Sequence, residues 1–485
     1  MALTVHNCLT RSREEFKPVR EGYVHIYVCG PTIYDHAHIG HAKAYISFDT
    51  IVRYFRYLGY RVRYVQNITD VGHLLDTGED RIMKGVRRDH VEPMELVETY
   101  MRSYFEDMDT LNVGRPNISP RPSCHITEQI ELAQQLLEKG HAYEAHGSVY
   151  FDVASWPEYG KLSGRRVEEQ EEGARVAVNP EKHHPADFAV WKKAEPDHIL
   201  RWPSPWGWGY PGWHIECSVM ATKYLGQPFD IHGGGLENIF PHNECEVAQI
   251  EAATGEQFCN YWLLNNMVTV DGVKMGKSLG NAIPLKELFK RHSPVTVRFF
   301  VLSSHYRSPT DFGEEALEAA ARGLERLTGA VGQVRERLRD GRDGAVDPEW
   351  AIKREEYKAQ FKEAMDDDFN TPRAIAVLFD LSRQVNTLLN SGQSVSRGTL
   401  EAIDGVYETL GGDVLGLRFE GQVVGGVSQA GSDLMDGLVR MLIDVRQEAR
   451  KAREWAKADA IRNRLAEMGI ALEDGPEGSR WRVSR

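Results

Sequence analysis

The stretch from Tyr23 to Asp70 constrains the fold of this chain more than any other part of it. Its first residues, YVHIYVCG (Tyr23 to Gly30), are short, rich in strand-forming residues and ended by Gly-Pro, which is typical of a buried strand. From about Gly40 to Leu58 apolar residues recur at helical spacing, and RVRYVQNITD (Arg61 to Asp70) has the pattern of a second strand. Strand, helix and strand in this order predict a βαβ unit, and therefore an α/β fold with a Rossmann-like parallel sheet.

The rest of the chain divides by its pattern of residues. From about Arg115 to Trp202, frequent Pro and Gly and an acidic patch indicate an insertion, and PFDIHGGG (Pro228 to Gly235) returns to a strand followed by glycine. Beyond about Glu314 the pattern is helical, apart from a glycine-rich segment from Gly411 to Ser432. We therefore expect a sheet interrupted by an inserted domain and followed by helices, with Gly411 to Ser432 linking two helical parts.

Composition excludes several classes of protein. The chain has 485 residues, 41% of them hydrophobic, and a net charge of −13, which is ordinary for a multidomain globular protein. It has no run of about 18 apolar residues and no apolar core near its start, so we expect neither a membrane span nor a secretory signal, and a cytoplasmic location. In the cytosol, six cysteines are better interpreted as free thiols or metal ligands than as disulfides.

A first motif, His38-Ile39-Gly40-His41, follows the first strand. In open α/β sheets this connection is where ligands bind. Histidines there can donate hydrogen bonds to a phosphate, glycine permits close backbone approach, and the N-terminus of the next helix favours an anion. A lone histidine would favour a surface loop instead, but His-x-Gly-His directly after a strand favours a phosphate site.

A second motif, Lys274-Met275-Gly276-Lys277-Ser278, lies far along the chain. A loop with two lysines three residues apart can close over a triphosphate and offset the charge that develops at the α-phosphate. Any two lysines alone would favour an exposed charged turn. Together the two motifs outweigh that alternative and indicate an enzyme that uses ATP.

A third set of residues consists of Cys29, Cys217, His242 and Glu246. His242 and Glu246 are four residues apart on a predicted helix, so both side chains face the same way. Two thiolates, one imidazole and one carboxylate are a reasonable ligand set for zinc. Spacing alone leaves buried structural cysteine as the commoner outcome, because there is no CxxC pair. Cys245, three residues after His242, could compete with Glu246 as a ligand.

The C-terminal residues 440–485 contain 11 basic and 8 acidic residues, in contrast to the acidic chain as a whole. Trp455, Asp459 and Arg462 share one face of a predicted helix, and Arg450 precedes it. An aromatic ring and arginines on one face can stack on unpaired bases and bond to them. Without other information, a solvated amphipathic helix would be the better interpretation.

Together these motifs resemble those of the class I aminoacyl-tRNA synthetases. The segments CGPTIYDHAHIGHA, PGWHIECS, DIHGGGLENIFPHNECE and KMGKSLGN resemble the cysteinyl-tRNA synthetase family, in the same order, and the resemblance covers nearly the whole chain. It implies a ligase that uses ATP to convert L-cysteine to cysteinyl-adenylate, and then transfers cysteine to the 3′-terminal adenosine of tRNA(Cys). It also implies one Zn²⁺ per chain that selects the substrate thiolate over the hydroxyl of serine. Mg²⁺ is expected with ATP, and the protein is expected to be a monomer.

The resemblance implies roles for individual residues. Catalysis is expected from His38, His41, Lys274 and Lys277. ATP binding is expected from Thr32, His38, Gly40, His41, Gly233, Gly234, Gly235 and Lys277, with His232 beside these glycines. Zinc is expected on Cys29, Cys217, His242 and Glu246, and substrate cysteine beside Cys29, Thr69 and Trp213. Contacts with the anticodon are expected from Arg450, Trp455, Asp459 and Arg462.

The resemblance also implies how the domains are arranged. A Rossmann catalytic domain is expected over 1–116 and 205–268, interrupted by an inserted connective domain over 117–204. These are followed by a stem-contact region with the lysine loop (269–320), a helical bundle (321–422) and a C-terminal anticodon-recognition region (423–485).

Some features depart from the family's pattern. Asn243 replaces the second histidine of HHENE, Cys245 is an added thiol, and Gly276 replaces the serine of the lysine loop. The segment 71–80 is longer than usual, and we assign it no role. Two other functions stay open, namely a ligase that joins cysteine to an amino sugar and a non-catalytic RNA-binding relative. The helical C-terminus disfavours the first, and the retained histidines and lysines disfavour the second.

Overall fold

The computed structural model describes residues 2–71, 80–165, 180–196, 198–276, 279–339, 341–419, 429–452, 454–467, 470–475 and 478–483. The chain forms two compact units, Met1–Phe419 and Glu420–Arg485. Each unit is described by itself. Within the described residues, no helix combines the length and the apolar character needed to cross a membrane.

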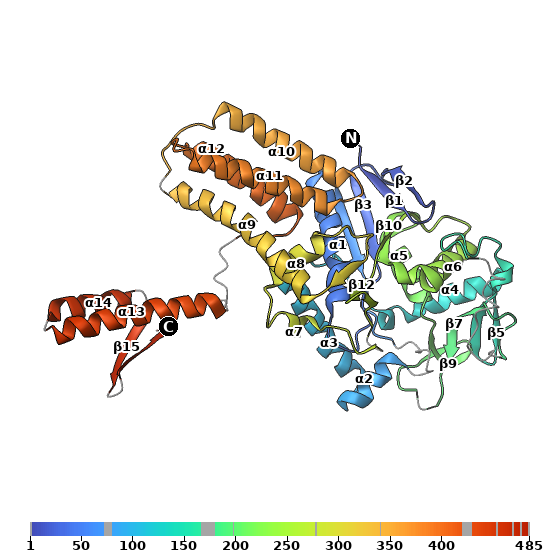
Figure 1. Ribbon diagram of the computed structural model, residues 1–485. Helices are drawn as coiled ribbons and strands as arrows, with labels where there is room; N and C mark the ends of the chain where they lie inside the picture. The colour runs from blue at the N-terminus through green and yellow to red at the C-terminus, as the bar shows by residue number, and fades with distance from the viewer. Residues whose placement is uncertain are drawn as a thin grey trace. The chain divides into compact units, whose positions relative to one another are not determined.

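A four-stranded parallel sheet forms the centre of the first unit (Figure 1). Its order is β11 (Cys259–Asn265), β10 (Phe229–Gly235), β3 (Tyr23–Val28) and β4 (Arg61–Gln66), all paired in parallel. Helix α1 (Ile39–Tyr57) connects β3 to β4 and is buried along most of its length. The predicted βαβ unit and the α/β fold class are therefore confirmed.

Shorter elements surround this sheet. The hairpin β1 (Thr4–Asn7) and β2 (Ser12–Glu15) precedes β3, and helices α2 (Arg81–Asp89) and α3 (Pro93–Thr110) follow β4. Helices α5 (Ile215–Leu225) and α6 (Glu244–Thr254) flank β10 in the chain, and a π-helical turn, η5 (Ile239–Asn243), leads directly into α6.

The inserted region has a sheet of its own. Helix α4 (Ile126–Glu138) is followed by an antiparallel sheet of five strands in the order β5, β6, β7, β9, β8. Their bounds are Ala142–Ala145, Ser148–Phe151, Phe188–Lys193, Gly207–Pro211 and Trp202–Ser204. Large apolar side chains from β6, β7 and α4 join one buried cluster with those of α5 and α6. The insertion therefore packs on the helices that carry part of the site described below.

The region after β11 begins with a small sheet of β12 (Val268–Val270), β13 (Val273–Lys274) and β14 (Thr310–Phe312). Helices α7 (Leu285–Leu288) and α8 (Pro294–Leu302) lie between β13 and β14 in the chain. Four longer helices then form a bundle, α9 (Glu314–Arg339), α10 (Pro348–Asp366), α11 (Thr371–Asn390) and α12 (Arg397–Val406). Their apolar faces continue the buried cluster that begins under the parallel sheet.

The prediction of a linker from Gly411 onward was wrong at its start. A π-helical segment, Tyr407–Val414, continues α12, and Gly411 within it is buried. A Cβ at Gly411 would lie 2.5 Å from the ring of Phe419, so glycine here allows close packing rather than flexibility. The residues from 420 to 428 lie outside the described part of the chain.

The second unit is small. Helix α13 (Gln429–Lys451) packs on α14 (Trp455–Glu467), and the hairpin β15 (Ile470–Gly475) and β16 (Gly478–Val483) follows (Figure 1). Ala458 and Leu465 of α14 are buried, and they mark the side of this helix that faces the unit's own core.

Candidate active site

A cavity of about 320 Å³ lies where β3, β4 and β10 end. This is the edge of a parallel sheet at which ligands bind in α/β folds. Many residues with predicted roles line it, namely Cys29, Thr32, His38, Gly40, His41, Thr69, Trp213, Cys217, Gly234, Gly235, His242 and Lys274. The fold thus gathers side chains that are more than two hundred residues apart in the sequence.

The two histidines of the first motif lie at the start of α1. Their rings stack with centroids 3.9 Å apart, and the backbone N–H of His38 donates to Nδ1 of His41 at 3.1 Å. A Cβ at Gly40 would lie 2.8 Å from the Met275 side chain, so glycine lets the lysine loop approach the helix start. The two motifs therefore meet at the same side of the cavity.

Backbone hydrogen bonds fix the far end of the lysine loop to the first motif. The N–H of Ile39 donates to the carbonyl of Ile283 at 3.1 Å, and the N–H of Leu285 donates to the carbonyl of Ala37 at 2.9 Å. Inside the loop, Asn281 accepts from the N–H of Gly276 at 2.9 Å. Lys277 and Ser278 lie outside the described residues.

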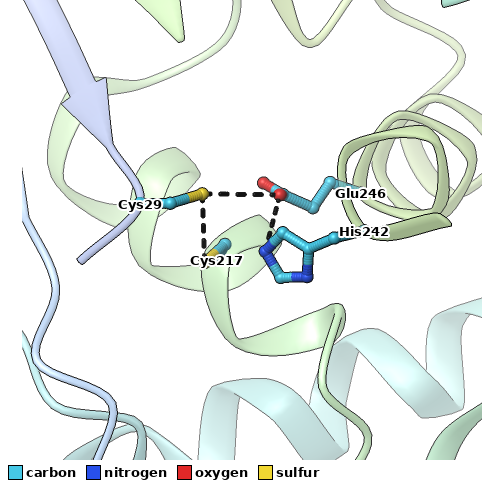
Figure 2. Close-up of side chains that lie close together, drawn as sticks. All are labelled: Cys29, Cys217, His242 and Glu246. Carbon is cyan, nitrogen blue, oxygen red and sulfur yellow. Dashed lines mark hydrogen bonds and ion pairs between the residues drawn. The ribbon is translucent and has the colours of Figure 1, made fainter. Parts of the chain in front are cut away.

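Four side chains with metal-binding atoms converge beside the cavity (Figure 2). Cys29 follows β3, Cys217 lies on α5, His242 on η5 and Glu246 on α6. Their ligand atoms all lie within 4.8 Å of one another. The two sulfur atoms are 4.0 Å apart, and Oε1 of Glu246 lies 3.9 Å from Sγ of Cys29 and 3.0 Å from Nε2 of His242.

This donor set fits a zinc ion. Two sulfurs, one imidazole nitrogen and one carboxylate oxygen make four ligands of the types that zinc takes, at separations that a tetrahedral site can accommodate. The structure therefore brings together the four residues predicted to bind metal, and a divalent cation is compatible with the arrangement.

Charges inside the cluster shift the pKa of each group. Burial lowers the pKa of His242, but the carboxylate of Glu246 outweighs it and raises the value to about 10. Burial opposes ionisation of Glu246, yet the imidazoles of His232 and His242 lower its pKa well below the ordinary value. The hydrogen bond with Cys29, followed by burial, raises the pKa of Cys217. A cation that binds here must displace thiol protons, because the thiolate is the form that ligates metal.

Two further histidines, His232 and His214, contact the proposed metal ligands Glu246 and His242. Nε2 of His232 lies 2.7 Å from Oε2 of Glu246, and the His232 ring stacks on Trp262 with centroids 4.1 Å apart. Nδ1 of His214 lies 3.1 Å from Nδ1 of His242. Such outer contacts orient ligands. The buried ring of His232 faces Glu246 and does not line the cavity, so its expected place beside the adenosine stays a prediction.

The three glycines of β10 differ in their surroundings. A Cβ at Gly233 would lie 2.4 Å from the ring of Phe48 on α1, whereas one at Gly234 would lie 3.7 Å from the nearest atom of Cys29. Gly234 and Gly235 line the cavity, and Gly233 faces the helix instead. Gly233 thus serves the packing of α1 on the sheet.

Cys245 points away from the metal cluster. Its sulfur is buried and lies 3.5 Å from the hydroxyl of Tyr159. The group of four ligands does not include it. Competition between Cys245 and Glu246, which helical spacing left open, is therefore not supported by the geometry. On a helix, residue i+3 points about 100° away from residue i+4, so the turn that brings Glu246 to His242 directs Cys245 toward Tyr159.

Two cavity residues were missed by sequence reasoning. Asn67 accepts from the N–H of Gly30 at 2.7 Å and donates to Oγ1 of Thr69 at 2.9 Å, so it ties the ends of β3 and β4 together. Arg81, the first residue of α2, also lines the cavity, and its Nε is buried without a hydrogen-bond partner in the described part of the chain. Asn67 could have been noticed in the turn after β4, but no spacing pattern singles out Arg81.

The predicted anticodon residues lie in the second unit. Arg450 lies in the last turn of α13, and Trp455, Asp459 and Arg462 lie on α14. All four are exposed, and the side chain of Trp455 is 58% exposed. A tryptophan with this much exposed ring surface is available to a partner.

Comparisons with known proteins agree along the whole chain. Residues 15–322 match the family described as tRNA synthetases class I (C) catalytic domain, residues 360–420 match the DALR domain, and residues 436–482 match the cysteinyl-tRNA ligase anticodon binding domain. A cysteine–tRNA ligase of Deinococcus radiodurans is 51% identical over 99% of this chain and 96% of its own length. One from Thermus thermophilus is 48% identical over 100% of both chains.

A likeness in structure extends to more distant proteins. The methionyl-tRNA synthetase of Mycobacterium tuberculosis, solved with methionyl-adenylate, has a TM-score of 0.60 at 16% identity, and the match covers 84% of this chain and 96% of that one. A leucyl enzyme from Agrobacterium radiobacter, solved with tRNA, has a TM-score of 0.58 at 14% identity and covers 84% and 85%. At these identities the likeness concerns the fold alone.

Proposed function

The chain belongs to the cysteine–tRNA ligase family of class I aminoacyl-tRNA synthetases, and from this premise we propose that it charges tRNA(Cys) with L-cysteine in two steps driven by ATP. One observation carries the proposal. Cys29 and Cys217 line the same cavity as His38, His41 and Lys274. Thiol recognition and phosphate chemistry can therefore act on one bound amino acid.

In the first step a carboxylate oxygen of cysteine attacks the α-phosphorus of ATP. A P–O bond forms, the bond to the bridging oxygen breaks, and pyrophosphate leaves with that oxygen and its electron pair. His38 and His41 would donate hydrogen bonds to the phosphates, and Lys274 and Lys277, with the Mg²⁺ that accompanies ATP, would offset the developing charge. Positioning and charge suffice for this reaction, so no side chain needs to act as a nucleophile.

Selection of cysteine over serine would rest on the metal cluster. Cys29, Cys217, His242 and Glu246 would hold Zn²⁺, which supplies a soft acceptor that prefers thiolate to hydroxyl. An apolar pocket could not separate two substrates of such similar shape well enough. Thr69 and Trp213 line the same cavity and would hold the rest of the amino acid. Arg81 is available to pair with its carboxylate.

In the second step a ribose hydroxyl oxygen of the terminal adenosine attacks the carbonyl carbon of the adenylate. The new ester C–O bond forms, AMP leaves with the electron pair of the broken C–O bond, and the hydroxyl proton is released. Arg450, Trp455, Asp459 and Arg462 would contact the anticodon, because exposed aromatic and arginine side chains suit unpaired bases.

The test is cysteine-dependent exchange of labelled pyrophosphate into ATP, followed by charging of tRNA(Cys). Exchange is expected with cysteine and not with serine at the same concentration. Lys274→Met should slow it, and Lys290→Met, which removes an exposed lysine paired with Glu287, should not. Exchange that requires no cysteine, or RNA binding with no exchange at all, would overturn the proposal. Transfer of cysteine to an amino sugar but not to tRNA would favour the alternative ligase.

A further inference from the structure

In the chain, Asn243 lies between the proposed metal ligands His242 and Glu246. In space, its side chain contacts the ligands Glu246 and Cys29. It is fully buried at the point where η5 passes into α6. Its Nδ2 lies 3.0 Å from Oε1 of Glu246 and 3.9 Å from Sγ of Cys29. The i to i+3 spacing on this turn brings its amide beside the carboxylate.

The hydrogen bonds of Glu246 show what the amide does. Oε2 accepts from His232, and Oε1 faces both Nε2 of His242 and Nδ2 of Asn243. Nδ1 of His242 is engaged with His214, so Nε2 is the nitrogen left for a metal. An imidazole nitrogen that binds a metal has no proton to donate, and neither has the sulfur of Cys29, which also faces Oε1, when it ligates as the thiolate. Asn243 is then the remaining donor to Oε1 among the residues that the structure describes.

The same amide nitrogen also lies within reach of Cys29. A primary amide has two N–H groups, and the 3.9 Å separation to Sγ is within hydrogen-bonding range for sulfur. One side chain therefore contacts both a carboxylate ligand and a thiol ligand of the cluster.

The orientation of the amide follows from its neighbours. Turning it over would place Oδ1 against the Glu246 carboxylate and the Cys29 sulfur, both of which are electron-rich. Oδ1 instead points elsewhere, where it is buried with no hydrogen-bond partner in the described ranges. A group that leaves one polar atom unsatisfied while it supplies two donors to a ligand cluster is arranged for that cluster.

We propose that Asn243 is a positioning residue of the metal centre, which raises metal affinity by holding Glu246 and Cys29 in their ligating geometry. The inference rests on the proposed function only in that it takes the four-residue cluster to be a metal site. Outer-shell contacts of this kind are worth about 10- to 100-fold in metal affinity. A neutral amide keeps both donors at every pH at which the protein is folded.

The experiment measures zinc affinity of the full-length chain by competition with a chromophoric chelator. Asn243→Leu keeps the branched shape and the number of side-chain heavy atoms and removes both donors. Its matched control is Gln249→Leu, which removes another fully buried amide. Gln249 lies on α6 and accepts a hydrogen bond from Ser218, and the described structure shows no hydrogen bond from it to a proposed ligand. We expect zinc to bind about 10- to 100-fold more weakly to Asn243→Leu and unchanged to Gln249→Leu.

A spectroscopic measurement separates positioning from general damage to the fold. With Co²⁺ in place of zinc, loss of the N–H donor to sulfur should move the thiolate-to-cobalt absorption of Asn243→Leu to longer wavelength, and Gln249→Leu should keep the spectrum of the unchanged chain. If Asn243→Leu fails to fold, Asn243→Ala is measured in the same way. Equal zinc affinity and an unshifted cobalt spectrum would overturn the inference. Absence of zinc binding by the unchanged chain would instead overturn the metal site of the proposed function.

Discussion

Replacing Gly233 by alanine tests how closely α1 packs against β10 beside the cavity. The added methyl carbon would lie 2.4 Å from Cε1 and 2.6 Å from Cζ of Phe48, and 3.0 Å from Cγ2 of Val28. Phe48 is fully buried, so its ring cannot turn into solvent. The methyl group must therefore push α1 away from the sheet or force the ring out of its preferred rotamer.

The size of the effect follows from the cost of overpacking. Extra methyl groups in packed cores destabilise by about 1–3 kcal/mol. For a unit of 419 residues, with an unfolding entropy of roughly 2.1 cal/mol/K per residue, this lowers the midpoint of thermal unfolding by about 1–3 °C. Since α1 begins at the histidine motif, cysteine-dependent pyrophosphate exchange should slow as well.

Gly234→Ala is the matched control. Its methyl carbon would meet Cys29 at 3.7 Å and Leu264 at 4.0 Å, which are ordinary contacts. We expect the free energy of unfolding of this variant to remain within about 0.5 kcal/mol of the unchanged chain. Denaturant unfolding followed by fluorescence measures both variants. If Gly233→Ala unfolds at the same denaturant concentration as Gly234→Ala, then the ring of Phe48 has room to move, and α1 is not packed too closely on β10 to accept a methyl group.

Other substitutions probe other parts of the molecule. Arg298→Met should lower the free energy of unfolding by about 3–5 kcal/mol, because it breaks a buried ion pair and leaves Asp49 with Arg53 as its remaining charged partner among the described residues. Burial alone would raise the pKa of Asp49, but Arg298 lowers it below the ordinary value. The stability that this pair contributes is therefore present above the pKa of an unfolded aspartate and is lost as pH falls through the folded pKa. Acid unfolding of the unchanged chain and of Arg298→Met will measure this loss. Arg81→Met should raise the KM for cysteine in pyrophosphate exchange by roughly tenfold, since it removes a charge-assisted contact, and should change the melting temperature little. An unchanged KM would exclude pairing of Arg81 with the substrate carboxylate. Trp455→Ala should weaken binding of tRNA(Cys) by roughly 5- to 150-fold if the ring stacks on one base, while exchange without tRNA stays the same. Cys217→Ser should reduce the zinc content of purified protein, and a full complement of zinc in that variant would count against the ligand set.

The parallel sheet could be predicted because its pattern is local. β3, α1 and β4 are consecutive, and each has the period of its own structure. The linker assigned from Gly411 failed because glycine serves both flexibility and close packing, and only the Phe419 ring that lies against Gly411 distinguishes the two.

The site could be predicted only in part, for a similar reason. The four ligands were named from their chemistry and from a family resemblance, and the structure places them together. The contact between His232 and Glu246 was not foreseen, because it depends on which face of β10 packs against α6. The direction of Cys245 could not be predicted, because it depends on the packing of α6 against Tyr159 of the inserted region.

The two backbone bonds that join Ile283 to Ile39 and Leu285 to Ala37 fix the histidine motif to the chain that follows the lysine loop. The lysine loop is tied at one end by these bonds and at the other by the pairing of β13 with β12. Both ends of the loop are thus held by backbone hydrogen bonds, one of them directly to the histidine motif. The entropy of ordering this motif is lost once, when the chain folds, instead of in every catalytic cycle.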